Sequence, residues 1–228
     1  MNNITIAIDG FSSTGKSTLA KQLAKHLGYV YVDTGAMYRA VTYFAMQNHL
    51  VGEDFLDKEG LIQKLTEIKL HFQFNPELGF AEMYLNNVNV EMQIRTIEVS
   101  RLVSKIAEIS EVRSKLVEQQ QEMGKNKGIV MDGRDIGTVV FPEAELKLFM
   151  TASAHTRAKR RFDELVEKGQ NVSYDEVLQN VEERDYIDTH REDSPLVKAQ
   201  DAIEIDNSTL TKKEQFDLVL ELIHKFFA

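Results

Sequence analysis

A stretch near the N-terminus has the residue types and the spacing of a phosphate-binding loop. "GFSSTGKS", which begins at Gly10, fits the pattern G-x-x-x-x-G-K-[ST] between the apolar run "ITIAI" and the helical pattern "LAKQLAKHL". In such a loop successive backbone N–H groups face one anion, and the following helix adds its positive N-terminal end. Lys16 is placed to reach the β- and γ-phosphates, and the Ser17 hydroxyl to bind Mg²⁺. The motif predicts a nucleoside triphosphate site made of Gly10, Phe11, Ser12, Ser13, Thr14, Gly15, Lys16, Ser17 and Thr18.

Arginines beyond this loop have the spacing of a clamp for a moving phosphoryl group. In "HTRAKRRFDEL", Arg157, Arg160 and Arg161 follow at i, i+3 and i+4 and share one helix face. A kinase needs positive charge around the transferred group and a lid that excludes water. We therefore expect these arginines to act with Lys16 in catalysis. A solvated basic helix face has the same pattern and is the alternative.

A second charged helix pattern occurs in "ERDYIDTHRED". Arg184, Asp188 and Arg191 follow at i, i+4 and i+7, which places them on one face. We interpret this face as part of a substrate-binding surface. The alternative is a surface ladder of salt bridges, which contributes only about 0.3–0.5 kcal/mol per pair.

Acidic residues directly follow three of the apolar runs. They are Asp9, Asp33 and Asp132, and in parallel sheets ligands bind beyond the carboxyl ends of the strands, so these acids are candidates for function. The alternative is that each aspartate only forms a turn. The stretch "MDGRDIGTVVFP" also places Arg134 and Asp135 just after a run of this kind, where three charges have no simple structural explanation. We therefore interpret Arg134 and Asp135 as candidate functional residues, and a purely structural role is the alternative.

The stretch "VDTGAMYRA" follows the second apolar run. It places Thr34 at the start of a predicted helix and Arg39 one turn further on. A helix N-terminus favours an anion, so the phosphate of an acceptor is expected here, with Arg39 assisting. The alternative is that Thr34 only caps the helix.

Five short apolar runs separated by helical patterns must position these residues. The runs are "ITIAI", "YVYV", "GIVM", "LKLFM" and "AIEI". This alternation is typical of an α/β fold with three layers, in which a five-stranded parallel sheet has helices on both faces.

One segment departs from the alternation of strand and helix. "LHFQFNPELGFAEMYLNNVNV" alternates apolar and polar residues around the turn "NPELG", which predicts a small antiparallel β insertion. A helix is expected before it, over roughly 53–68, and "EQQQEMGKNKG" is expected to be a frayed helix end and loop. We predict a single unit, 1–228, with a core of about 1–50, 108–154 and 170–228, an insertion of about 51–107 and a lid of about 155–169.

The composition is that of an ordinary soluble domain. Hydrophobic residues make up 43%, charged residues 28%, the net charge is -9, and cysteine is absent. An acidic balance argues against a general nucleic-acid or membrane-surface binder, and no run approaches the ~18 apolar residues of a membrane span. We expect a cytoplasmic protein, and a monomer, because no large apolar stripe remains once the core is assigned.

Other classes of nucleotide-binding protein are less consistent with the sequence. A GTPase needs N/T-K-x-D, and the nearest strings, "NKG" and "TKKE", lack the aspartate. A motor or transporter ATPase is usually larger. A kinase for an acid or alcohol, and a non-catalytic nucleotide-binding module, remain as alternatives.

Taken in order, these stretches resemble bacterial cytidylate kinases of the nucleoside monophosphate kinase group. The resemblance runs nearly end to end, through "DGFSSTGKST", "DTGAMYR", "IRTIEVS", "DGRDIGTVVFP", "RAKRR", "ERDYIDTHRED" and "SPL". It implies a P-loop kinase fold with an arginine-rich lid and a nucleotide-binding insertion. It also implies transfer of the γ-phosphoryl group of ATP to CMP or dCMP, with ATP and Mg²⁺ as cofactors.

The resemblance also assigns roles to matching positions. Residues 10–18 would bind the ATP phosphates, and the three arginines of "RAKRR" correspond to the lid. The motif arginine Arg95 is either a binding or a structural residue. The CMP site would be lined by Thr34, Arg39, Arg113, Arg134, Asp135, Arg184, Asp188 and Arg191, with Asp188 near the cytosine.

The chain departs from the commoner family pattern at a few positions. Phe11, Ser13 and Thr14 replace proline, glycine and alanine in the loop, and Thr34 replaces serine while keeping the hydroxyl. The acidic residues of the predicted site favour cytosine independently, because carboxylates accept hydrogen bonds from its exocyclic amino group and repel the oxygen of uracil.

Overall fold

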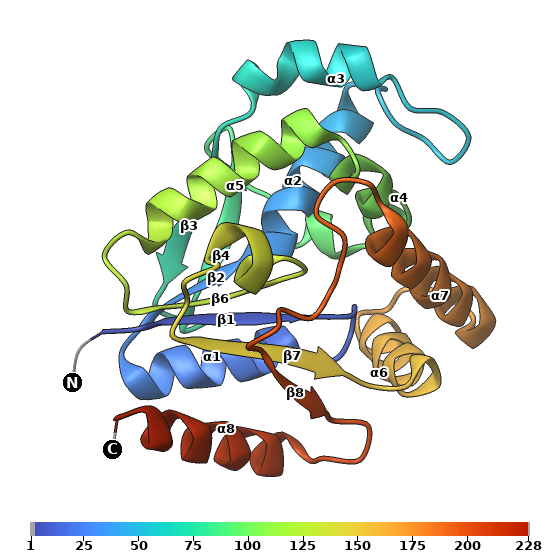
Figure 1. The fold of residues 1–228 in the computed structure, drawn as a ribbon. Coiled ribbons are helices and arrows are strands. Elements are labelled where there is room, and N and C mark those ends of the chain that lie inside the picture. Colours follow the sequence, from blue (N-terminus) through green and yellow to red (C-terminus); the bar gives the residue numbers. More distant parts are fainter. Residues whose placement is uncertain (1–2, 228) are drawn as a thin grey trace.

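The computed structural model describes residues 3–227, so the first two residues and the last of the predicted 1–228 unit lie outside the described residues. Five parallel strands form the central sheet in the order β2-β6-β1-β7-β8 (Figure 1). They are β1 Thr5–Gly10, β2 Val30–Asp33, β6 Ile129–Gly133, β7 Leu146–Thr151 and β8 Ile203–Asp206. Each apolar run of the sequence is one of these strands, and the predicted α/β fold with a five-stranded parallel sheet is confirmed.

Helices cover both faces of this sheet (Figure 1). The helices on one face are α1 Lys16–Leu27 and α8 Lys212–Phe227, and those on the other are α2 Thr34–Gln47 and α5 Ser110–Gly124. In α1, Leu19 and Leu23 are four residues apart and fully buried in one apolar cluster with Ile6 and Ile8 of β1. This apolar face of α1 fixes the direction in which the helix leaves the sheet.

Two glycines determine the path of the loop between β1 and α1. At Gly10, φ is +140° and a Cβ would lie 2.0 Å from the Met150 carbonyl oxygen on β7. At Gly15, which precedes α1, φ is +91°. A side chain is excluded at the first position and strained at the second. Part of the phosphate-loop pattern is therefore a steric requirement of the strand and helix that it joins.

The insertion contains a second, smaller sheet, which confirms the predicted antiparallel element. Its strands are β3 Leu70–Asn75, β4 Phe80–Leu85 and β5 Val88–Asn89. The helix before this sheet is shorter than predicted: residues 53–57 are not helical, and α3 spans Lys58–Lys64, followed by the 3₁₀ turn Leu65–Glu67. Asp57 accepts the Gly60 N–H at 2.8 Å, so the cap and not the acidic residues upstream sets where α3 begins.

Three further helices lie together beyond the carboxyl ends of the strands (Figure 1). They are α4 Ile97–Ala107, α6 Ala154–Glu167 and α7 Tyr174–His190. Because α7 ends at His190, Arg191 lies just after the helix, in extended backbone. Within "EQQQEMGKNKG" the helix end extends to Gly124, where α5 ends, and the predicted loop follows over residues 125–128. Within residues 3–227 no helix combines the length and the apolar character needed to cross a membrane.

Candidate active site

A large cavity of about 1010 Å³ lies at the carboxyl ends of the parallel strands. The phosphate loop forms one wall, and α6, α7, the insertion and the segment 207–215 contribute to the others. Gly10 and Phe11 are not among its lining residues. The predicted site residues that line it are Ser12, Ser13, Thr14, Gly15, Lys16, Ser17, Thr18, Arg39, Arg134, Arg160, Arg161 and Arg184.

Lys16 is buried, with its ammonium group against oxygen atoms of its own loop. Nζ donates to the Phe11 carbonyl at 2.5 Å and to the Thr14 hydroxyl at 3.3 Å. Burial, and then the positive charge of Arg134, lower the pKa of Lys16 to about 7. A phosphate anion stabilises the charged form of a lysine. The loop is therefore suited to an anionic ligand that would restore the ordinary charge of Lys16.

Ser17 and Asp132 meet at the base of the loop. Ser17 Oγ donates to Asp132 Oδ2 at 2.9 Å, and the Tyr31 hydroxyl donates to Oδ1 at 2.8 Å. Burial and the neighbouring Asp33 raise the pKa of Asp132 to about 6. Mg²⁺ takes one or two protein oxygen ligands together with phosphates and waters. A serine hydroxyl and a buried carboxylate beside a phosphate loop fit this cation.

Asp9, buried at the end of β1, holds the segment that follows β6. Its carboxylate accepts the first two N–H groups of the π-helical turn Ile136–Val140, at 2.8 and 2.7 Å. Burial raises the pKa of Asp9 to about 7. The contact fixes the backbone just after Arg134 and Asp135, so Asp9 positions these two residues at the site.

Asp33, and not Thr34, caps α2, which corrects the capping alternative. Asp33 Oδ1 accepts a backbone N–H of the first helical turn at 2.9 Å, whereas the Thr34 hydroxyl donates to the Asp132 carbonyl at 2.8 Å. Asp33 Oδ2 pairs with Arg39 at 3.0 Å and Arg95 at 3.1 Å. Although burial opposes it, these two guanidinium groups hold the pKa of Asp33 well below its usual range.

A smaller chamber of about 60 Å³ adjoins the large cavity. Its lining includes all eight residues predicted for the acceptor: Thr34, Arg39, Arg113, Arg134, Asp135, Arg184, Asp188 and Arg191. Arg39, Arg134 and Arg184 line both spaces, so the chamber and the cavity meet at these arginines. A ligand that fills the chamber can reach from there toward the phosphate loop.

Two carboxylate–arginine pairs form part of the chamber wall. Asp188 Oδ2 accepts Arg134 Nε at 2.7 Å, and its Oδ1 accepts the Ser104 hydroxyl at 3.3 Å. Asp135 pairs with Arg113, whose side chain is only 2% exposed. Although burial opposes it, Arg134 lowers the pKa of Asp188. An ionised carboxylate has about four acceptor positions, so both acids retain capacity for a ligand donor.

Three of the arginines at these cavities have no carboxylate within 4.0 Å among residues 3–227: Arg160, Arg184 and Arg191. Neutral oxygen atoms hold each of them instead. Arg160 binds the side-chain and backbone oxygens of Asn207 at 3.1 and 2.8 Å. Arg184 binds the Ser100 hydroxyl at 3.0 Å, and Arg191 binds a backbone carbonyl at 2.8 and 2.6 Å. Their positive charge is thus left for a ligand.

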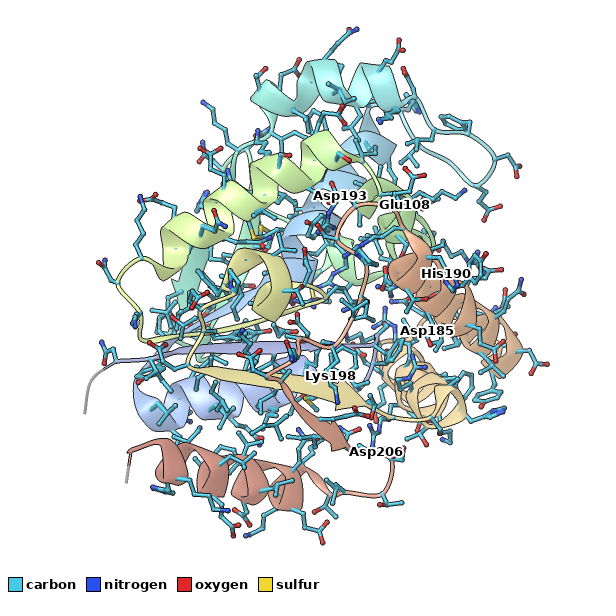
Figure 2. The ribbon with its side chains drawn as sticks, in the orientation of Figure 1. Glu108, Asp185, His190, Asp193, Lys198 and Asp206 are labelled. Atoms are coloured by element: carbon cyan, nitrogen blue, oxygen red, sulfur yellow. The ribbon has the colours of Figure 1, made fainter. Side chains whose placement is uncertain are left out.

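Arg157 lines neither space and is buried behind the phosphate loop. It forms a bidentate pair with Asp185 at 2.9 and 2.5 Å, and donates to the Ser12 carbonyl at 3.3 Å. Its guanidinium lies 5.2 Å from the centroid of the Phe11 ring. Asp185, labelled in Figure 2, is on the side of α7 that faces α6. The structure thus separates Arg157 from the other two arginines of its helix, which line the cavity.

Several uncharged site residues were not predicted from the sequence. Ser100 and Ser104 of α4 bind Arg184 and Asp188, respectively. Asn207, just after β8, donates to the backbone of the phosphate loop. Ser100 ends the stretch "IRTIEVS", but no role followed from that, and the i, i+4 spacing of the two serines is common on helices that have no site.

The fold and these two connected spaces define the class of protein. A phosphate loop after the first strand, a five-stranded parallel sheet and arginines beyond the strand ends are the parts of a P-loop kinase. The crystal structure of an uncharacterized protein from Eubacterium ventriosum has a similar fold, with a TM-score of 0.51 and 12% identity over 98% of this chain and 99% of that chain.

Sequence relatives then identify the family within this class. The sequence model of the family described as cytidylate kinase matches residues 6–225. A cytidylate kinase of Flavobacterium johnsoniae is 78% identical over 98% of this chain and 97% of its own length. One from Bacteroides thetaiotaomicron is 56% identical over 99% and 98%. The chain belongs to the cytidylate kinase family of nucleoside monophosphate kinases, which confirms the resemblance found in the sequence.

Proposed function

We propose that this protein transfers the γ-phosphoryl group of ATP to CMP and to dCMP, giving CDP or dCDP and ADP. One observation carries the proposal: the chamber lined by the eight predicted acceptor residues meets, at Arg39, Arg134 and Arg184, the cavity that contains Lys16. A nucleoside monophosphate with its base in the chamber would have its phosphate at this junction, facing the donor. Membership of the cytidylate kinase family supports the phosphorylation of CMP by ATP.

The carboxylates of the chamber suit cytosine. Asp135 and Asp188 are held by arginines in a buried space, where each can accept a hydrogen bond from the exocyclic amino group of the base. Uracil presents an oxygen atom at the same position, and a buried carboxylate facing that oxygen would be left unpaired. Sites of this kind reject the mismatched substrate strongly. dCMP differs from CMP only in the sugar, so the same selection applies to it.

On the donor side, residues 10–18 are the proposed loop for the phosphates of ATP. Residues 12–18 of this loop line the cavity, and Ser17 with Asp132 would hold Mg²⁺. When bound, the cation neutralises charge on the phosphate oxygens. Arg160 and Arg161 line the cavity from α6, and Arg161 pairs with Glu164 at 3.0 Å. These two arginines belong to the catalytic set with Lys16, whereas the contacts of Arg157 give it a supporting role.

Transfer is direct and in line. An anionic oxygen of the acceptor phosphate attacks the γ-phosphorus, and the bond from that phosphorus to the β–γ bridging oxygen breaks, its electron pair leaving with ADP. No strong general base is required, because the attacking oxygen already carries charge. Catalysis is positioning and charge stabilisation. The residues that hold the acceptor in place are Arg39, Arg134, Arg184 and Arg191.

The parts of the chain divide this work. The insertion, 51–107, contributes Leu78 of the turn between β3 and β4 and Phe80 of β4 to the wall of the large cavity. The lid, 155–169, contributes Arg160 and Arg161. Closure of both over the substrates would exclude water, which otherwise competes as acceptor. The unit acts as a cytoplasmic monomer.

The experiment that tests this function is ADP release from Mg-ATP with CMP, dCMP, UMP, AMP, GMP or no acceptor. We expect fast release with CMP and dCMP. Release with UMP should be at least about tenfold slower, because one buried hydrogen-bonding group left unpaired costs about that much in binding. Release without an acceptor would indicate an ATPase. No release with any of them, while ATP still binds, would mean a different acceptor.

Asp188→Ala tests the assignment of the base pocket. Loss of a charged hydrogen-bond acceptor should raise the KM for CMP about 10–100-fold and leave ATP binding within about twofold, because Asp188 does not line the donor side. Asp175→Ala, exposed on the same helix, is the matched control. Unchanged CMP kinetics in Asp188→Ala would remove this residue from the base site.

A further inference from the structure

Arg184 is oriented by the Ser100 hydroxyl group, which donates its own proton to Asn180. Arg184 Nη1 donates to Ser100 Oγ at 3.0 Å, and Ser100 Oγ donates to Asn180 Oδ1 at 3.0 Å. Both supporting residues are buried, Ser100 on α4 and Asn180 one helical turn before Arg184 on α7. Because Asn180 takes the serine proton, the lone pairs of the hydroxyl are directed to the guanidinium.

Arg184 keeps its charge and part of its hydrogen-bonding capacity. Its Nε is buried and has no hydrogen-bond partner, and no carboxylate lies within 4.0 Å of the guanidinium in the described part of the chain. Burial and the nearby Arg134 lower the pKa of Arg184 to about 9, which still leaves it protonated at neutral pH. A partly buried cation without a carboxylate partner costs free energy, and an anionic ligand at the junction would compensate that cost.

The other two arginines at the junction are held differently. Arg134 pairs with Asp188 at 2.7 Å, and Arg39 pairs with Asp33 at 3.0 Å. A carboxylate partner orients a guanidinium but cancels much of its field at short range. Arg184 is the junction arginine that is held in place by neutral groups alone.

We propose that Ser100 and Asn180 are positioning residues that form a neutral anchor for Arg184, leaving its full charge for the phosphate of the acceptor. The inference rests on the proposed function, which places that phosphate at the junction. Asn180 is the deciding residue. An aspartate has the same shape and would accept the Ser100 proton equally well, but it would bring a negative charge one hydroxyl group away from the guanidinium.

Asn180→Asp is therefore the informative substitution, with Gln179→Glu as its control. Gln179 is the exposed neighbour on the same helix, and the control adds the same charge to α7. Titration calorimetry without donor compares CMP with cytidine, which lacks the phosphate. We expect Asn180→Asp to weaken CMP binding about tenfold and cytidine binding less than about twofold. Gln179→Glu should change neither.

Two further variants keep the inference testable if Asn180→Asp is poorly folded. Ser100→Ala removes the anchor without adding charge and should weaken CMP binding several-fold more than cytidine binding. In an Arg184→Ala background, Asn180→Asp should have no further effect on CMP, because the two residues act through one group.

The outcomes separate this inference from the function on which it rests. CMP binding by folded Asn180→Asp equal to that of the unaltered protein would overturn the anchor. So would an equal loss for CMP and cytidine, or an equal loss with and without Arg184, because each would indicate a packing role only. If Arg184→Ala itself binds CMP normally, the proposed acceptor role of Arg184 fails first.

Discussion

Among single residues, Lys16 has the most direct part in binding phosphate. It is buried, and its hydrogen bonds go to neutral oxygens of Phe11 and Thr14, so no carboxylate within 4.0 Å in residues 3–227 neutralises it. We expect Lys16→Ala to lower kcat on the order of 10²–10³-fold while the circular dichroism spectrum stays that of the unaltered protein. Lys25→Ala, exposed on the same helix, should keep full activity. Comparable turnover in the two variants would mean that Lys16 does not reach the transferred group.

The lowered pKa of Lys16 predicts a pH dependence of donor binding. In the free protein, burial and Arg134 lower this pKa to about 7, and a bound triphosphate raises it, because anions favour the charged form. Binding above neutral pH therefore takes up a proton, and the affinity for ATP should fall between about pH 7 and pH 9, where the phosphates are already ionised. Calorimetry across this range measures the slope. The Lys16→Arg side chain stays charged throughout this range, so the ATP affinity of this variant should not depend on pH. An unchanged pH dependence in Lys16→Arg would mean that another group titrates.

The residue types explain which parts of the site were predictable. The shared helix face of Arg184 and Asp188 indicated a candidate binding surface from their spacing, but a surface salt-bridge ladder has the same spacing, and only their burial in the structure separates the two. Ser100 and Asn180 are uncharged residues of a kind found on many helices, and only the packing of α4 on α7 brings them together. Arg157 shares its helix face with two cavity arginines, and the sequence pattern cannot show that the buried part of this face meets Asp185.

Among the elements, strands were easier to predict than helix ends. A strand of the parallel sheet is covered on both faces and appears as a continuous apolar run, as in β1 and β6. A helix end depends on one capping contact. Asp57 begins α3 and Asp33 begins α2, whereas the sequence offered several acidic or hydroxyl residues near each position and no means of choosing among them.

Arg157 joins α6 to α7 and to the phosphate loop, so its partner should matter for stability. Asp185→Ala leaves a guanidinium that is 4% exposed without its carboxylate. Breaking a fully buried pair costs about 3–5 kcal/mol, and because Asp185 is partly exposed we expect a loss of about 2 kcal/mol in the free energy of unfolding. Urea denaturation measures this.

The matched control for this pair is Asp217→Ala, which breaks the exposed i, i+4 pair with Lys213 on α8. Exposed pairs of this kind contribute little to stability, so the free energy of unfolding of this variant should stay close to that of the unaltered protein. Equal stability of the two variants would mean that the contacts of Arg157 do not hold the three elements together. That result would favour the catalytic role that the sequence predicted for Arg157.

Over the whole molecule, charge is segregated. The chain has 36 acidic against 27 basic residues, yet lysine and arginine outnumber aspartate and glutamate among the residues that line the two connected spaces. The exterior is therefore more acidic than the chain average. A cation-rich cleft in an acidic protein attracts a small anion at short range, whereas the acidic exterior repels an extended polyanion such as nucleic acid. This distribution of charge therefore favours a small anionic substrate over a nucleic acid.

This segregation predicts how salt affects binding. Raising NaCl from about 50 to about 500 mM shortens the screening length from about 14 to about 4 Å, so the attraction of the cleft for CMP should weaken, by about three- to tenfold in Kd measured by calorimetry. Cytidine lacks the phosphate, and its Kd should stay nearly constant. Equal weakening of both ligands would mean that salt acts on the fold or on base binding. No change in either would mean that the contacts of the buried chamber alone account for the affinity, because buried pairs are screened least.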